Sequence, residues 1–176
     1  AYSSVAHAGF LLMALACTPT ASQAGEFLSP AKVIAFYLGA YLLMTLLAFL
    51  VMTTVRVQIP GEDLTSYKGL AKRSPFLAFA MIISMASLAG IPLTAGFFGK
   101  FFVFQLAVQQ QQWFLLTVGL VGAGAGFYYY LKIAGSMFLS EQDPKDDISA
   151  IPVGTLSRIA MIVLIALILI GGLNPA

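Results

Sequence analysis

The sequence predicts an all-α, polytopic membrane helix bundle with five transmembrane helices, the third of them broken. Of its 176 residues, 60% are hydrophobic and only 9% are charged, whereas soluble domains contain roughly 25% charged residues. Apolar stretches of about 20 residues, the length that crosses ~30 Å of hydrocarbon as a helix, recur along the chain. This composition excludes a soluble enzyme or a nucleic-acid-binding domain as a first interpretation. We therefore expect residues 1–176 to form a single membrane domain.

The first two predicted spans lie before a polar loop. Residues 2–16 form the first, which is short for a span, and residues 31–55 form the second, which carries no charge after Lys32. Residues 56–74 follow as a loop rich in charged side chains. The chain starts at Ala1 without a basic leader, so we expect no signal peptide. We interpret it as a fragment, a split subunit or a processed piece.

The third predicted span contains its own interruption. Residues 75–108 would extend about 50 Å as one helix, which exceeds the bilayer core. Gly90 and Pro92 lie in the middle of this stretch. Proline removes a backbone donor and glycine tolerates unusual dihedral angles. We therefore predict two half-helices joined by an unwound segment, with Gly96 and Gly99 completing the set of hinge residues.

The last two predicted spans flank a charged loop. Residues 113–139 form the fourth, and residues 153–173 form the fifth, which ends at helix stop signals. Basic residues concentrate in the loops at 56–74 and 140–150, whereas the opposite side has only Lys32. Because basic loops stay in the cytoplasm, we expect those loops and the N-terminus to be cytoplasmic and the C-terminus to lie across the membrane.

Lys100 is the residue in this sequence that most needs a functional explanation. It is surrounded by apolar residues and follows the predicted break by about two turns. A lysine inside the bilayer costs from about 2.5 to more than 10 kcal/mol. One interpretation is an ammonium group that reaches the nearer interface along its alkyl stem. We favour the alternative, a buried lysine that loads and releases a proton, because broken helices beside ionisable groups recur in ion transporters.

Two further ionisable residues are candidates for proton transfer. His7 lies in the first span, where a lone histidine is either a structural hydrogen-bonding group or a relay that titrates near neutral pH. Ser3 and Ser4 are placed to hold water beside it. Lys132 follows three consecutive tyrosines, and for it the simpler interpretation is a lysine that reaches the interface. Ser84, Ser87 and Thr94 flank the break and are candidates to bond its freed backbone groups.

The chain carries no residues that indicate a redox centre of its own. It contains one cysteine and one histidine. A disulfide framework, a cysteine-based iron–sulfur site and a multi-histidine haem or zinc site are therefore excluded. We expect no metal and no cofactor on this chain.

Several motifs resemble a known family. They are residues 2–9 (YSSVAHAG), 66–75 (SYKGLAKRSP), 87–92 (SLAGIP), 96–101 (GFFGKF) and 128–132 (YYYLK). Their order and spacing resemble those of the antiporter-like (Mrp-type) proton-translocating membrane subunits, in particular subunit N of bacterial complex I, the NADH-quinone oxidoreductase. The resemblance covers essentially the whole chain. It implies that the chain is the C-terminal portion of an antiporter-like subunit whose N-terminal half is missing. It also implies a location in a bacterial inner membrane, with the C-terminus periplasmic.

The resemblance implies a role in redox-driven proton translocation. Members of the family carry a lysine within a broken helix on a hydrated axis, and Lys100 is the matching position. It also implies other complex I membrane subunits as partners, with NADH, FMN, iron–sulfur clusters and quinone on partner subunits. The family's glutamate and other lysines are absent from this chain, so it would supply only part of a proton path. A subunit of an Mrp-type cation/proton antiporter and a purely structural membrane fragment remain as alternatives.

Overall fold

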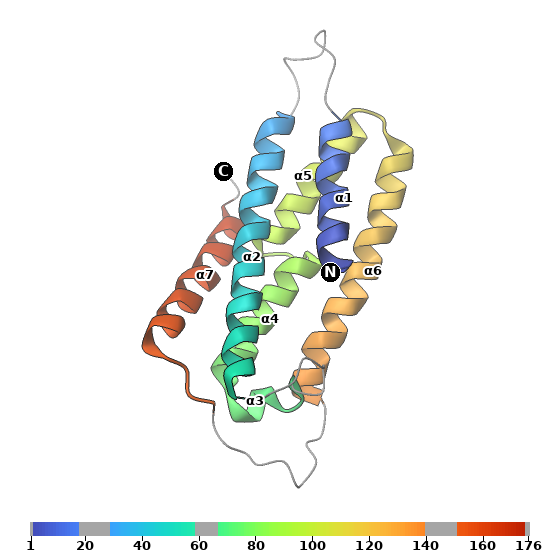
Figure 1. Cartoon of the computed structure of the whole chain (residues 1–176). Helices are drawn as coiled ribbons and strands as arrows, with labels where there is room; N and C mark the ends of the chain where they lie inside the picture. Colours follow the sequence, from blue (N-terminus) through green and yellow to red (C-terminus); the bar gives the residue numbers. More distant parts are fainter. Residues whose placement is uncertain (1, 18–28, 59–66, 140–150, 175–176) are drawn as a thin grey trace.

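The computed structural model describes residues 2–17, 29–58, 67–139 and 151–174 of the chain. Within these ranges all regular secondary structure is helical, and the helices run up and down a single bundle (Figure 1). Residues 18–28, between the first two predicted spans, and the acidic residues of both charged loops lie outside the described residues. The helices are α1 (Tyr2–Ala16), α2 (Pro30–Gln58), α3 (Leu70–Arg73), α4 (Pro75–Ala89), α5 (Ala95–Gln109), α6 (Trp113–Leu139) and α7 (Thr155–Leu173).

Three helices are each long and apolar enough to cross a membrane alone. These candidate spans are Pro30–Val57, Trp113–Phe138 and Thr155–Leu173. Large apolar side chains such as Phe114 and Leu156 are 78% and 82% exposed on the outside of the bundle. A protein that shows so much apolar surface requires an apolar surrounding. The predicted polytopic helical membrane fold is therefore confirmed.

The third predicted span consists of α4 and α5 stacked end to end. Each has 15 residues, which corresponds to about 22 Å of helix. Figure 1 shows α4 rising from one end of the bundle to its middle and α5 continuing from there to the other end. The chain leaves the helical path between Ala89 and Ala95. The predicted break at Gly90 and Pro92 is confirmed.

One helical turn lies within a segment that the sequence predicted as a loop. Gly69 adopts a left-handed conformation, with φ 67°, and α3 begins at the next residue. Leu70 is 1% exposed and packs into the main core cluster. Burial of this one leucine explains why α3 folds back against the bundle.

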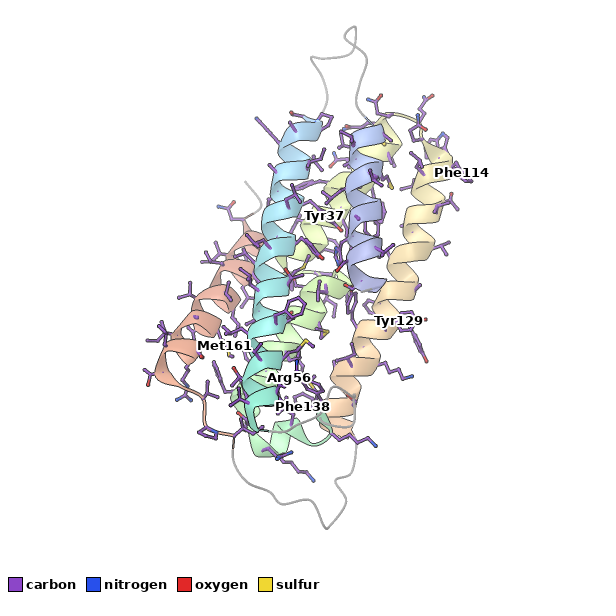
Figure 2. The ribbon with its side chains drawn as sticks, in the orientation of Figure 1. Tyr37, Arg56, Phe114, Tyr129, Phe138 and Met161 are labelled. Carbon is purple, nitrogen blue, oxygen red and sulfur yellow. The ribbon has the colours of Figure 1, made fainter. Side chains whose placement is uncertain are left out.

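The buried side chains form two clusters, one beside each half of α2. The larger joins α2 to α4, α6 and α7, and includes Met44, Leu77, Met137 and Met161. The smaller joins α1, α2 and α5. Figure 2 shows Met161 between α7 and the rest of the bundle. The break lies between the two clusters. The clustered buried residues of α4 belong to the larger cluster and those of α5 to the smaller.

The first turn of α1 lies level with the middle of α6, beside Tyr130, and not at an end of the bundle (Figure 1). The end of α2 and the short helix α3 lie at the lower end in this view, so Arg56, near the end of α2, and Arg73, the last residue of α3, lie there. Lys32 lies at the start of α2, at the opposite end. The charge asymmetry expected from the sequence therefore exists along the bundle axis.

Candidate functional site

The last four carbonyl groups of α4 need hydrogen-bond donors from outside the helix. Two of them receive donors from the chain that follows: Gly90 N–H donates to the Ser87 carbonyl at 3.0 Å, and Ile91 N–H donates to the Ala86 carbonyl at 2.9 Å. This pattern is a Schellman motif, which requires a residue with positive φ. Gly90 supplies it, with φ 86°. The carbonyls of Leu88 and Ala89 remain.

Lys100 supplies the missing donors. Its Nζ lies 2.7 Å from the Leu88 carbonyl oxygen and 2.9 Å from that of Ala89. The side chain is 7% exposed. A helix C-terminus carries partial negative charge, which favours a cation there. Lys100 therefore completes the C-terminal cap of α4 from one turn inside α5, and this is why an ammonium group is tolerated at mid-bundle.

The start of α5 is satisfied by hydroxyl groups beside the break. Ser87 Oγ accepts a hydrogen bond of 3.1 Å from Gly96 N–H. Thr94 Oγ1 donates to the Ile91 carbonyl at 2.7 Å. These two residues therefore bond the freed backbone, as the sequence predicted. Ser84 does not, because its hydroxyl donates across to the Met44 carbonyl of α2 at 2.7 Å.

The glycines around the break allow close approach of backbones. A Cβ at Gly96 would lie 1.9 Å from the Ser87 carbonyl oxygen, and a Cβ at Gly99 would lie 3.1 Å from the Tyr37 ring. A Cβ at Gly172 of α7 would lie 2.3 Å from the Leu93 carbonyl oxygen. Of the expected hinge residues, Gly90 has the special dihedral angles, whereas Gly96 and Gly99 serve as packing contacts. Pro92 lies exposed in the connecting turn.

His7 is at the centre of a second group of polar side chains. It is 2% exposed. Its Nδ1 shares a hydrogen bond of 2.8 Å with the Tyr37 hydroxyl of α2, and its Nε2 lies 3.4 Å from the Tyr130 hydroxyl of α6. Tyr130 in turn bonds Ser3. Three helices therefore contribute to a continuous chain of hydrogen-bonding groups, which runs from Ser3 through Tyr130 and His7 to Tyr37.

Phe10 lies near both groups. Its ring lies 5.7 Å from Lys100 Nζ and 6.4 Å from the His7 ring, both measured to ring centroids. An aromatic face attracts a cation at this distance. Lys100 and His7, chosen separately from the sequence, therefore lie in one region of the bundle.

Lys132 is not part of this region. Its side chain is exposed on α6. The neighbouring tyrosines differ in exposure. Tyr129 is 64% exposed and projects outward from α6 in Figure 2, whereas Tyr130 is 8% exposed. The position of Lys132 agrees with the simpler interpretation, in which its ammonium group reaches the membrane interface.

Sequence reasoning missed the contribution of α2. Tyr37 and Tyr41 are four residues apart, so they share one face of the helix. Tyr37 bonds His7, and the Tyr41 ring lies 4.7 Å from the His7 ring. The sequence signal that could have identified these residues is a pair of tyrosines on one face of an otherwise apolar span.

The site contains basic but no acidic side chains among the residues that the structure describes. All seven acidic residues of the chain fall in the segments 18–28, 59–66 and 140–150, outside the described ranges. No group of His, Cys, Asp and Glu in the described part is arranged to hold a metal ion. Within that part, backbone carbonyls are the acceptors that face Lys100.

Two comparisons with known proteins show what this chain is similar to. A family described as NADH:quinone oxidoreductase/Mrp antiporter, TM, matches residues 1–126. A chain of respiratory complex I from Thermus thermophilus, solved with bound aureothin, is similar over 99% of this chain with 33% sequence identity and a TM-score of 0.78. The match covers 37% of that chain, so the present chain spans a little over a third of its length.

The family match covers well over half of the residues, and it includes α1, the whole of α2 to α5, and the part of α6 up to residue 126. An all-helical membrane bundle with one broken helix, together with these matches, leaves no doubt about the family. The chain belongs to the NADH:quinone oxidoreductase/Mrp antiporter family of antiporter-like membrane subunits.

Proposed function

We propose that this chain contributes part of a proton path to a proton-pumping NADH:quinone oxidoreductase in a bacterial inner membrane. The observation that carries the proposal is Lys100, which is buried at the break and bonded to the Leu88 and Ala89 carbonyls. Partner subunits would hold NADH, FMN, iron–sulfur clusters and quinone. The charged end of the bundle would face the cytoplasm.

Lys100 is suited to exchange a proton because its hydrogen bonds do not depend on a fixed charge. An ammonium group has three donors, of which two are used by α4 carbonyls. The third is free to donate to water. After loss of a proton the amine retains two N–H donors and gains a lone pair. The lysine therefore has a favourable position in both protonation states.

The chain of groups at His7 offers a lateral route. Ser3, Tyr130, His7 and Tyr37 each carry a group that donates and accepts, and together they connect α6 to α2. Phe10 separates this chain from Lys100, so water or a side-chain movement has to connect the two. We propose His7 as the relay and Lys100 as the residue that loads and releases the proton.

The proposal is tested with the assembled complex reconstituted in sealed vesicles. Lys100→Met keeps an unbranched side chain that is one atom shorter and removes the amine that carries the proton. We expect NADH-driven acidification of the vesicle lumen to fall to a small part of the wild-type rate. Lys32→Met is the matched control, because Lys32 is an exposed lysine at the end of a span, and it should pump normally.

The alternatives predict different results. A purely structural role predicts normal pumping by Lys100→Met. An Mrp-type antiporter subunit predicts cation/proton exchange in vesicles without NADH oxidation, and loss of that exchange in the variant. The 33% identity to a complex I chain favours the first proposal.

A further inference from the structure

A cavity of about 450 Å³ lies at the charged end of the bundle, where α4 and α7 both begin. Arg73, Ser74 and Phe76 line one side of it, and Val153 and Arg158 line the other. The length of α4, ~22 Å, separates this cavity from the break. It is therefore distinct from the region around Lys100.

Both arginines that line the cavity carry N–H groups without a hydrogen-bond acceptor among the described residues. Arg73 Nε is buried and has no hydrogen-bond partner among the residues that the structure describes. Arg158 lies over the Phe76 ring, with 5.3 Å from its Cζ to the ring centroid. This contact holds the guanidinium in place, and its N–H groups donate to no acceptor among the described residues. A buried guanidinium nitrogen without an acceptor is costly, so its presence indicates that something else accepts the bond.

The helix ends add to the positive potential. Ser74 precedes α4 and Gly154 precedes α7, and neither provides a side-chain cap. Neither helix has an acidic residue in its first turn. The free N–H groups and partial positive charge of such helix starts attract anions. The Ser74 side chain itself is 7% exposed and lines the cavity, which places one more hydroxyl donor there.

We propose that this cavity binds a phosphate group at the membrane interface. Arginine matches the planar, two-pronged arrangement of phosphate oxygens better than any other side chain. The volume falls within the range of roughly 300–1,000 Å³ that accommodates an organic ligand. The Phe76 ring and the buried Ile151 provide apolar wall beside the donors. The phosphodiester of an anionic lipid headgroup and a free phosphate ion share this chemistry.

The test uses the purified, delipidated complex and native mass spectrometry. Phosphatidylglycerol and phosphatidylcholine are added separately, and retained lipid is counted for wild type, for Arg73→Gln/Arg158→Gln and for Lys72→Gln. Lys72 is an exposed basic neighbour that does not line the cavity. We expect wild type and the Lys72 variant to retain phosphatidylglycerol preferentially. The double variant should bind it at least about tenfold more weakly, since two charge-assisted contacts are lost.

Competition with inorganic phosphate distinguishes the two sources. Displacement of phosphatidylglycerol by millimolar phosphate indicates that a free ion suffices, whereas undisturbed lipid indicates a lipid site, and both results support the proposal. Equal retention by wild type and double variant overturns it, and so does the absence of any preference for the anionic lipid. The latter result is expected if a carboxylate from residues 140–150 occupies the cavity. If the double variant does not assemble, Arg158→Gln at an exposed position gives the same comparison.

Discussion

Gly96 provides the sharpest test of the broken helix. A Cβ at this position would lie 1.9 Å from the Ser87 carbonyl oxygen, 2.7 Å from its carbonyl carbon and 2.9 Å from its Oγ. The first two atoms are backbone, so they cannot rotate away. Gly96→Ala therefore requires α4 and α5 to separate by at least about 1 Å to reach an ordinary contact distance.

The free-energy cost of this separation has two parts, overpacking and a lost hydrogen bond. Overpacking by one carbon in a tight core typically costs about 1–3 kcal/mol. Here the same shift stretches the 3.1 Å bond from Gly96 N–H to Ser87 Oγ, whose loss adds roughly 0.5–1.5 kcal/mol. We therefore expect Gly96→Ala to destabilise the folded bundle by about 2–4 kcal/mol.

The measurement is the unfolding of the purified chain in mild detergent by titration with SDS, followed by far-UV circular dichroism. Gly124→Ala is the matched control, because no atom lies within 4 Å of a Cβ at Gly124 on α6. It should leave stability unchanged or raise it by up to about 1 kcal/mol, since alanine has a higher helix propensity than glycine. Equal stability of Gly96→Ala and wild type would refute the direct contact between the two half-helices.

Three further predictions concern the same region. Ser84→Ala removes a buried interhelical hydrogen bond of 2.7 Å and should cost about 0.5–2 kcal/mol in the same titration; no change would mean that the bond does not form. Leu93 has φ 74° and is 63% exposed, so Leu93→Gly should be neutral or stabilising by up to about 2 kcal/mol, whereas a large loss would indicate hidden packing. Tyr37→Phe leaves buried His7 without its 2.8 Å partner and should cost about 1–3 kcal/mol and slow NADH-driven pumping. Tyr129→Phe, at an exposed position, should do neither, and similar effects of both substitutions would contradict the assigned role of Tyr37.

The sequence by itself determined the membrane class, the approximate spans and the break. Long uncharged runs are specific for transmembrane helices because charge is costly in hydrocarbon. Gly90 and Pro92 marked the interruption through backbone chemistry that depends on local sequence alone. Lys100 stood out for the same reason, as a cation in an apolar stretch. These are local properties, and the structure agrees with each of them.

Only the tertiary structure decided which groups meet. Tyr37 and Tyr130 reach His7 from positions 30 and 123 residues away, and Arg73 meets Arg158 across one cavity. Both faces of a membrane helix are apolar. The periodic pattern of apolar and polar residues that marks the buried face of a soluble helix is therefore absent. The same reason explains why the exposed Tyr129 and the buried Tyr130 were indistinguishable in the sequence. Contacts between such helices depend on the close fit of small residues and on a few polar groups, which only the packed bundle brings together.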